Sequence, residues 1–278
     1  MRYFKMNGCG NDFVILDARE VGTLALTEAQ VRAIADRTDG VGCDQVIAVE
    51  RSIRGDAFMR SWNADGGEVA ACGNATRCVG WILGQENAPR RFKIETRAGL
   101  LAAEPSGPNM IRVDMGSPLL KWEELPLSSA HDTVRLDYQV EVGDTVLAGP
   151  GGCNMGNPHV VFFVDDLALV PVTTIGPRVE KDPLFPEGVN VGFAEVRARD
   201  HLRLEVWERG AGRTLACGTG ACAAVVAGHR QGRVGRLLDV YLPGGVLTVE
   251  WRSSDDRVLM TGPVQLEATG VLEPISAL

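Results

Sequence analysis

The sequence predicts an α+β fold made of two similar domains that arose by internal duplication. Three observations support this prediction. The chain of 278 residues is about two domains long. Its two halves match each other in order, and its short β-rich runs outnumber its helical segments. Hydrophobic residues make up 45% and charged residues 23% of the chain, which is typical of a globular protein with buried cores.

The two halves match when the sequence is shifted by about 145 positions. Gly10–Val14 then lies over Gly156–Val160, Trp62 over Trp207, and Cys72 over Cys217. A repeat of this length indicates two similar domains rather than a solenoid array. Because the copies join near Gly116–Pro118 and the tail lies beyond the repeat, we place the domains at 1–117 plus 264–278 and at 118–263.

Short β-rich runs alternate with Gly-rich turns along both copies. The segment Thr27–Gln30 has the residues of a capping box, which predicts a helix that ends before Gly40. Each copy has a further helical stretch directly after its Ala-Cys-Gly sequence, over 74–83 and 219–230. The second of these is rich in alanine, which predicts a helix packed closely on all sides. The expected strands include residues 12–16, 46–49, 92–95 and 110–113.

Charge and composition exclude several functional classes. The formal net charge is −8, so no general attraction to nucleic acid or to an anionic membrane is expected. The chain has no run of about 20 apolar residues, and its first residues lack the apolar core of a signal peptide. We therefore expect a cytoplasmic protein. Its seven cysteines include no CxxC pair and no Cys/His zinc spacing, so no metal site is predicted.

Cys72 and Cys217 occupy equivalent places, where a Gly-rich turn enters a helix. The N–H groups at a helix start favour negative charge, so we expect these thiols to ionise more readily than an ordinary cysteine. The amides of Gly73–Asn74 and Gly218–Thr219 would suit a carboxylate. If the copies face each other across a pseudo-twofold axis, the two thiols flank one cleft. One thiolate can then remove a proton from a carbon while the opposite thiol returns one, which is racemisation or epimerisation.

The sequence offers no setting for pyridoxal phosphate, the electron sink that many racemases use. Its four lysines lie outside any Gly-rich phosphate-binding loop. We therefore predict a cofactor-free site in which helix ends and oriented amides stabilise the carbanion. Ionising one of two opposed thiols raises the pKa of the other, so the pair retains one proton.

The motifs around these turns resemble those of diaminopimelate epimerases. They are GCGNDF, GVGCDQ, NADGGEVAACGNATRC, MGNPH, EGVNV and ERGAGRTLACGTGACAA, and together they span nearly the whole chain in order. The resemblance implies a pyridoxal-independent epimerase that interconverts LL- and meso-2,6-diaminopimelate in lysine and peptidoglycan precursor biosynthesis. It also implies two pseudo-symmetric, barrel-like domains, each with a central helix, an active site in the cleft between them, and a homodimer.

The resemblance also assigns roles to individual residues. Cys72 and Cys217 would be the acid/base pair. His159 would support proton movement at Cys72, and Glu208 would support it at Cys217. The backbone amides of Gly73, Asn74, Gly218 and Thr219 would bind the reacting α-carboxylate. The other residues expected to line the pocket of this diamino dicarboxylic acid are Asn11, Gln45, Asn63, Asn157, Asn190, Glu208 and Arg209.

Two alternatives remain open at this point. A cofactor-free racemase of another amino acid, of the proline, hydroxyproline or histidine type, would use the same two thiols. The distal-binding set, above all Arg209 with Asn157 and Asn190, argues against so small a substrate. A non-catalytic redox sensor or metal-binding protein is the alternative of another class. The spacings of Cys72 to Cys78 and of Cys217 to Cys222 fit no usual zinc site.

Overall fold

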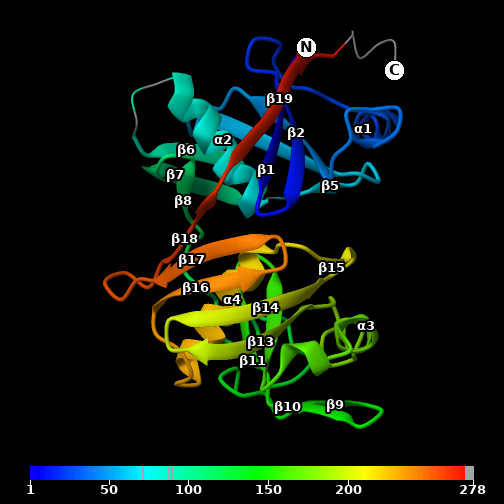
Figure 1. Ribbon diagram of the computed structural model, residues 1–278, viewed down its shortest axis with the longest axis vertical. Coiled ribbons are helices and arrows are strands. Elements are labelled where there is room, and N and C mark those ends of the chain that lie inside the picture. Colours follow the sequence, from blue (N-terminus) through cyan, green and yellow to red (C-terminus); the bar gives the residue numbers. More distant parts are fainter. Residues whose placement is uncertain (71, 87, 89, 273–278) are drawn as a thin grey trace. The chain divides into compact units, whose positions relative to one another are not determined.

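The computed structural model describes residues 1–70, 72–86, 88 and 90–272. Contacts within the chain divide it into two compact units (Figure 1), Met1–Asp114 with Thr261–Leu278, and Met115–Met260. Strands outnumber helices in both units, so the predicted α+β class is confirmed. No helix in the described ranges is long and apolar enough to cross a membrane.

The first unit is a mixed sheet around one helix, α2 (Gly73–Glu86), with a second helix, α1 (Glu28–Ala35), beside β3. Strand β1 pairs antiparallel with β2, β2 parallel with β3, β3 antiparallel with β4, and β4 parallel with β6. Strands β6, β7 and β8 follow as antiparallel neighbours. The strands are β1 (Arg2–Gly8), β2 (Asn11–Asp17), β3 (Gln45–Glu50), β4 (Ala57–Asn63), β5 (Glu68–Val69), β6 (Phe92–Thr96), β7 (Gly99–Gly107) and β8 (Met110–Asp114).

The C-terminal segment returns to this unit, as its position beyond the repeat suggests. Strand β18 (Val258–Pro263) pairs with β8, and β19 (Gln265–Val271) pairs antiparallel with β1 from Arg2 opposite Val271 to Asn7 opposite Gln265. The two consecutive strands therefore bridge both edges of the β1–β8 sheet. Helix α2 contacts β1, β2, β6, β7 and β8 and is the central helix of this unit.

The second unit repeats this plan around α4 (Gly218–Arg230), which contacts β11, β12, β13, β14, β16 and β17. Nearly all of α4 is buried, and its alanines and glycines let these strands approach closely. The other elements are β9 (Gln139–Val142), β10 (Thr145–Ala148), β11 (Gly151–Asn154), β12 (Pro158–Val164), η1 (Leu167–Leu169), α3 (Val172–Glu180), β13 (Asn190–Ala198), β14 (His201–Glu208), β15 (Gly212–Thr214), β16 (Leu237–Leu242) and β17 (Gly245–Trp251).

The duplication is confirmed in the register of the strands. The pairings of β1 to β4 in the first unit recur in the second with residues about 145 positions later. Phe13 opposite Gln45 corresponds to His159 opposite Asn190, and Val46 opposite Trp62 corresponds to Val191 opposite Trp207. The domain boundaries 1–117 plus 264–278 and 118–263 stay a prediction.

The predicted helix starts are also confirmed. Thr27 Oγ1 accepts a hydrogen bond from the backbone N–H of Gln30 at 3.3 Å, and the Gln30 side chain accepts one from the backbone N–H of Thr27 at 2.9 Å. This reciprocal capping box satisfies two N–H groups that the helix itself leaves unbonded. Helices α2 and α4 begin directly after Cys72 and Cys217.

Truncating Phe162 to alanine is expected to destabilise the second unit. Phe162 is 1% exposed and stacks on Phe193, with 6.0 Å between ring centroids. Removing a buried phenyl ring leaves a cavity and costs about 3–5 kcal/mol. A urea unfolding curve should show a lower midpoint for Phe162→Ala, while Val146→Ala, at a side chain 56% exposed, should leave the midpoint almost unchanged.

Candidate active site

Cys217 is the N-cap residue of α4, and its side chain closes the first turn of that helix. Its sulfur accepts a hydrogen bond from the backbone N–H of Gly220 at 3.3 Å and lies 3.5 Å from the hydroxyl oxygen of Thr219. The Glu208 carboxylate also interacts electrostatically with the Cys217 side chain. Of these two groups only the thiol can donate, so a proton passing between them moves from Cys217 to Glu208.

The expectation that a thiol at this place ionises readily is wrong for Cys217. Burial raises its pKa well above the ordinary value, and the neighbouring Glu208 carboxylate raises it further. The hydrogen bonds from Thr219 and Gly220 act in the opposite direction but do not compensate. Removing the thiol from water outweighs the helix N-terminus because a buried charge loses its hydration. Cys217 therefore carries its proton in this structure.

Glu208 stands at the end of β14 and is held in place by Thr214 of β15. The Thr214 hydroxyl donates a hydrogen bond of 2.5 Å to Glu208 Oε1. Burial raises the pKa of Glu208 above its ordinary value, whereas the bonds from Thr214 and Cys217 lower it. A carboxyl group with a raised pKa beside a buried thiol is suited to accept and return the thiol proton.

His159 lies fully buried on β12, beside the start of α4. Its Nε2 atom is 2.9 Å from Asn157 Oδ1 and 3.0 Å from Thr219 Oγ1. The Asn157 oxygen only accepts, so Nε2 carries a proton and Thr219 also accepts from it. The Thr219 hydroxyl is then available to donate to the Cys217 sulfur. The Thr219 side chain therefore links the His159 imidazole to the Cys217 thiol through two hydrogen bonds.

Burial, with a smaller contribution from the Arg209 guanidinium, lowers the pKa of His159 to about 3. The ring is therefore neutral at physiological pH. A depressed pKa stabilises the fold above about pH 6.5, and this contribution is lost as the pH falls toward 3. We expect the imidazole NMR signals of His159 not to shift between pH 5 and 8. A His159 midpoint near 6.5 would contradict the buried environment.

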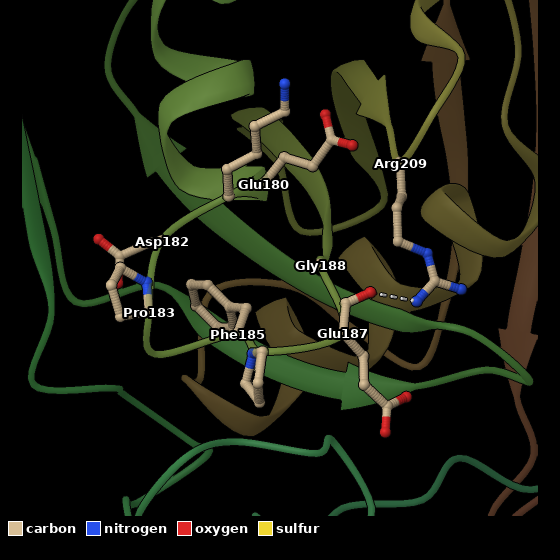
Figure 2. Close-up of a pocket in the computed structure, with 9 residues that line it drawn as sticks. Glu180, Asp182, Pro183, Phe185, Glu187, Gly188 and Arg209 are labelled. Atoms are coloured by element: carbon tan, nitrogen blue, oxygen red, sulfur yellow. Dashed lines mark hydrogen bonds between the residues drawn. The ribbon is translucent and has the colours of Figure 1, made fainter.

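Asn190 and Arg209 tie the β14–β15 turn to the strands beside it. The buried Asn190 amide donates to the Pro158 carbonyl at 2.8 Å and accepts from the Arg209 backbone N–H at 2.9 Å. The exposed Arg209 guanidinium donates to the Glu187 carbonyl at 2.8 Å, at the edge of a surface hollow (Figure 2). Glu180, also in this hollow, accepts from Trp207 Nε1 at 2.7 Å and from Gly210 N–H at 3.0 Å.

Cys72 has a matching position in the first unit, directly before α2. The backbone N–H of Ala75 donates to its sulfur at 3.5 Å, the equivalent of the bond from Gly220 to Cys217. The Thr76 hydroxyl donates to the Cys72 carbonyl at 2.8 Å and fixes the turn. Unlike buried Cys217, Cys72 is partly exposed.

The first unit joins four of the predicted site residues in two hydrogen-bonded pairs. Asn74 donates to Asn11 at 3.4 Å, and Gln45 donates to Asn63 at 2.8 Å. The structure thus brings the predicted residues together as two sets, one per unit. The first set is Asn11, Gln45, Asn63, Cys72, Gly73 and Asn74. The second is Asn157, His159, Asn190, Glu208, Arg209, Cys217, Gly218 and Thr219.

Sequence reasoning missed the residues that hold these two sets in place. Thr214 fixes Glu208, Glu180 fixes the turn that carries Arg209, and Asp44 accepts from Asn11 at 2.9 Å. Thr214 could have been found from the sequence, because it lies within the motif ERGAGRTLACGTGACAA. Cys78 and Cys222, which lie within α2 and α4, are both fully buried.

The fold resembles those of solved racemases and epimerases. A probable proline racemase from Agrobacterium radiobacter superposes with a TM-score of 0.70 at 16% identity, covering 98% of this chain and 92% of that one. A hydroxyproline epimerase from Agrobacterium vitis gives a TM-score of 0.67 at 18% identity, covering 97% and 91%. Identities this low establish the shared two-domain fold alone.

The sequence places the chain more narrowly. The family model for diaminopimelate epimerase matches residues 3–121 and 152–267. The diaminopimelate epimerase of Phenylobacterium zucineum is 54% identical over 270 residues, covering 97% of both chains. That of Acidiphilium cryptum is 52% identical over 271 residues, covering 98% of this chain and 96% of the other. The chain therefore belongs to the diaminopimelate epimerase family.

Proposed function

We propose that this chain is a pyridoxal-independent epimerase that interconverts LL- and meso-2,6-diaminopimelate. The observation that carries the proposal is the matched pair Cys72 and Cys217, each at the start of a central helix in a chain of this family. The reaction would supply lysine and peptidoglycan precursors in the cytoplasm, and the enzyme would act as a homodimer.

The two thiols divide the proton transfer between them. In one direction, Glu208 takes the proton of the Cys217 thiol, and the resulting thiolate removes the α-proton of the substrate. The electron pair left on the α-carbon delocalises into the α-carboxylate, and the Cys72 thiol then gives its proton to the opposite face. The reverse reaction exchanges the two roles. At least one proton stays on the pair at every stage, because two thiolates facing one carbon would repel each other.

The backbone amides stabilise the charge that develops on the carboxylate. Gly73 and Asn74 begin α2, and Gly218 and Thr219 begin α4, so their N–H groups are not used within the helices. Donors that are already oriented need no rearrangement as the charge forms. Both sets would line one cleft between the domains 1–117 plus 264–278 and 118–263.

His159, Glu208 and Arg209 in the second copy replace Phe13, Asn63 and Ala64 in the first. Of these, His159 and Glu208 would support proton movement at the reacting end, and Arg209 would bind the distal end of the substrate. Such an asymmetric set of side chains suits a substrate with one reacting end and one distal end. Asn157 and Asn190, together with Asn11, Gln45 and Asn63, complete the polar surface. A proline-type substrate has no second amino and carboxylate group to use it.

The deciding experiment is α-proton exchange in deuterated water with the reduced protein. LL- and meso-diaminopimelate should both incorporate deuterium and interconvert, without added pyridoxal phosphate. Proline, hydroxyproline and histidine serve as matched one-carboxylate substrates. Equal turnover of one of these would favour the racemase alternative. A correctly folded protein that exchanges none of them would leave the redox-sensor alternative.

A further inference from the structure

In the first unit, hydrogen bonds run in one direction from Arg77 to Asp44. Arg77 donates to Asn74 Oδ1 at 2.8 Å, Asn74 donates to Asn11 Oδ1 at 3.4 Å, and Asn11 donates to Asp44 Oδ2 at 2.9 Å. A guanidinium only donates and a carboxylate only accepts. The two amides between them therefore have one orientation that satisfies all three bonds.

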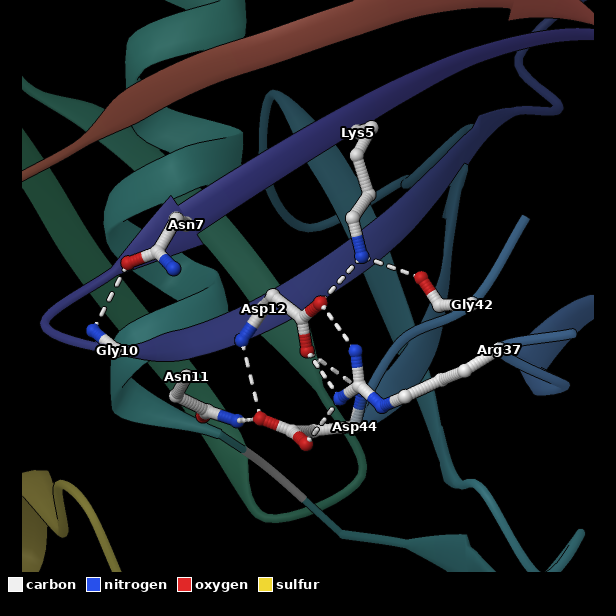
Figure 3. Close-up of polar contacts among 8 residues, drawn as sticks. All are labelled: Lys5, Asn7, Gly10, Asn11, Asp12, Arg37, Gly42 and Asp44. Carbon is white, nitrogen blue, oxygen red and sulfur yellow. Dashed lines mark hydrogen bonds and ion pairs between the residues drawn. The ribbon is translucent and has the colours of Figure 1, made fainter.

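Asp44 is itself fixed by a cluster of charged side chains (Figure 3). The other members of this cluster are Lys5, Asp12 and Arg37. Arg37 donates to Asp44 Oδ1 at 2.8 Å, and the backbone N–H of Asp12 donates to Asp44 Oδ2 at 3.1 Å. The Asp12 carboxylate accepts two bonds of 2.9 Å from Arg37 and a further one from Lys5. One oxygen of Asp44 is thus committed to Arg37, and the other is left to face Asn11.

The Asp12 carboxylate keeps its charge at physiological pH. Burial raises the pKa of Asp12, but the hydrogen bonds from Arg37 and Lys5 outweigh burial and hold this pKa well below the usual range. Asp12 and Asp44 oppose Lys5 and Arg37, so the negative and positive charges balance. A balanced, bidentate cluster holds its geometry better than a single exposed ion pair.

The Asn11 oxygen has two lone pairs, and the long bond from Asn74 uses only one of them. We propose that Asp44 is a positioning residue that keeps the other lone pair of this oxygen turned toward an ammonium group of the substrate. The proposal rests on the proposed function, whose substrate carries two amino groups. Gln45 supports it, since Gln45 donates its amide to Asn63 while its buried Oε1 accepts from none of the described residues. Phe13 pairs with Gln45, so Asn11 and Gln45 lie on one face of adjacent strands.

The test is the variant Asp44→Asn, which keeps the shape but has a single acceptor oxygen. That oxygen goes to Arg37, because the bond to the charged guanidinium is the strongest of those that Asp44 accepts. The new NH2 group then faces Asn11 and replaces the acceptor of the Asp12 backbone N–H. The Asn11 amide turns over to avoid two facing donors. We expect the KM for diaminopimelate to rise about tenfold, which corresponds to about 1.4 kcal/mol, while kcat stays within about threefold of the wild type.

The matched control is Asp56→Asn in the same unit. Asp56 also accepts from one arginine, Arg90 at 2.6 Å, and from one backbone N–H, that of Lys93 at 2.7 Å, but it contacts no candidate site residue. Loss of an ion pair alone would affect both variants alike. An equal rise of KM in Asp56→Asn would overturn the positioning role.

Exchanging the two residues provides the rescue. In the double variant Asn11→Asp/Asp44→Asn, the amide at position 44 accepts from Arg37 and donates to the carboxylate at position 11, whose other oxygen still faces the ligand. We expect KM to return to within about threefold of the wild type, and Asn11→Asp alone, with two carboxylates in contact, to remain worse. A double variant no better than Asp44→Asn overturns the proposal. Wild-type protein that exchanges no α-proton refutes the proposed function instead.

Discussion

Serine in place of Cys217 is expected to reduce kcat/KM for both diaminopimelate isomers by about a thousandfold or more. A hydroxyl group fits the N-cap position, since serine is a preferred capping residue, so the fold should persist. The serine hydroxyl is far less acidic than a thiol and does not supply a nucleophilic base at physiological pH. Loss of general acid–base catalysis costs about 10²–10⁴-fold, and the same residue serves as acid in the reverse direction. α-Proton exchange measured separately for each isomer gives the result.

Cys72→Ser should produce a loss of the same order, because the proposed mechanism needs both thiols in each direction. Cys222→Ala is the matched control, a buried cysteine one turn into the same helix as Cys217. Its activity should stay within a few-fold of the wild type, with a modest loss of stability from the small cavity. A Cys217→Ser protein that still epimerises at a tenth of the wild-type rate would eliminate the two-thiol mechanism.

The duplication makes most of the fold predictable from the sequence, but not the third helix or the β9–β10 hairpin. The helix over Val172–Glu180 corresponds to the one over Glu28–Ala35, yet its sequence contains Gly176 and Pro177 and gives no local helical signal. Tertiary packing explains the glycine, since a Cβ atom at Gly176 would lie 2.4 Å from the Trp207 ring. At this helix, tertiary packing outweighs the low helix propensity of glycine and proline. The hairpin of β9 and β10 has no counterpart in the first copy, so the repeat offered no guide to it.

The site was predictable where chemistry depends on local sequence. Cys72 and Cys217 follow from the repeat, and Glu208 and His159 from the motifs around them. The protonation of Cys217 was not predictable, because it depends on burial and on Glu208, which approaches from another strand. Asp44 and Thr214 escaped for the same reason. Each of these two residues contacts a site residue that only folding brings near it. In the sequence alone, each has the features of an ordinary polar residue.

Glu208→Gln is expected to reduce kcat by about a hundredfold or more while leaving the fold intact. The glutamine oxygen can still accept from Thr214, which now bonds Glu208 at 2.5 Å, but the amide takes up no proton from Cys217. Removing the carboxylate charge also lowers the pKa of Cys217. Burial is the larger cause of that raised pKa, however, so the thiol stays protonated and now lacks its acceptor.

The pH profile separates this role from a structural one. In the wild type, kcat/KM should fall as the pH drops through the raised pKa of Glu208, because a protonated carboxyl group takes no proton from the thiol. That acidic limb should disappear in Glu208→Gln. Glu205→Gln is the matched control on the same strand, where the carboxylate pairs with Arg213 at 2.7 Å. The Glu205→Gln variant should keep both the wild-type kcat and the acidic limb of the pH profile. If Glu208→Gln also keeps both, Cys217 ionises without Glu208.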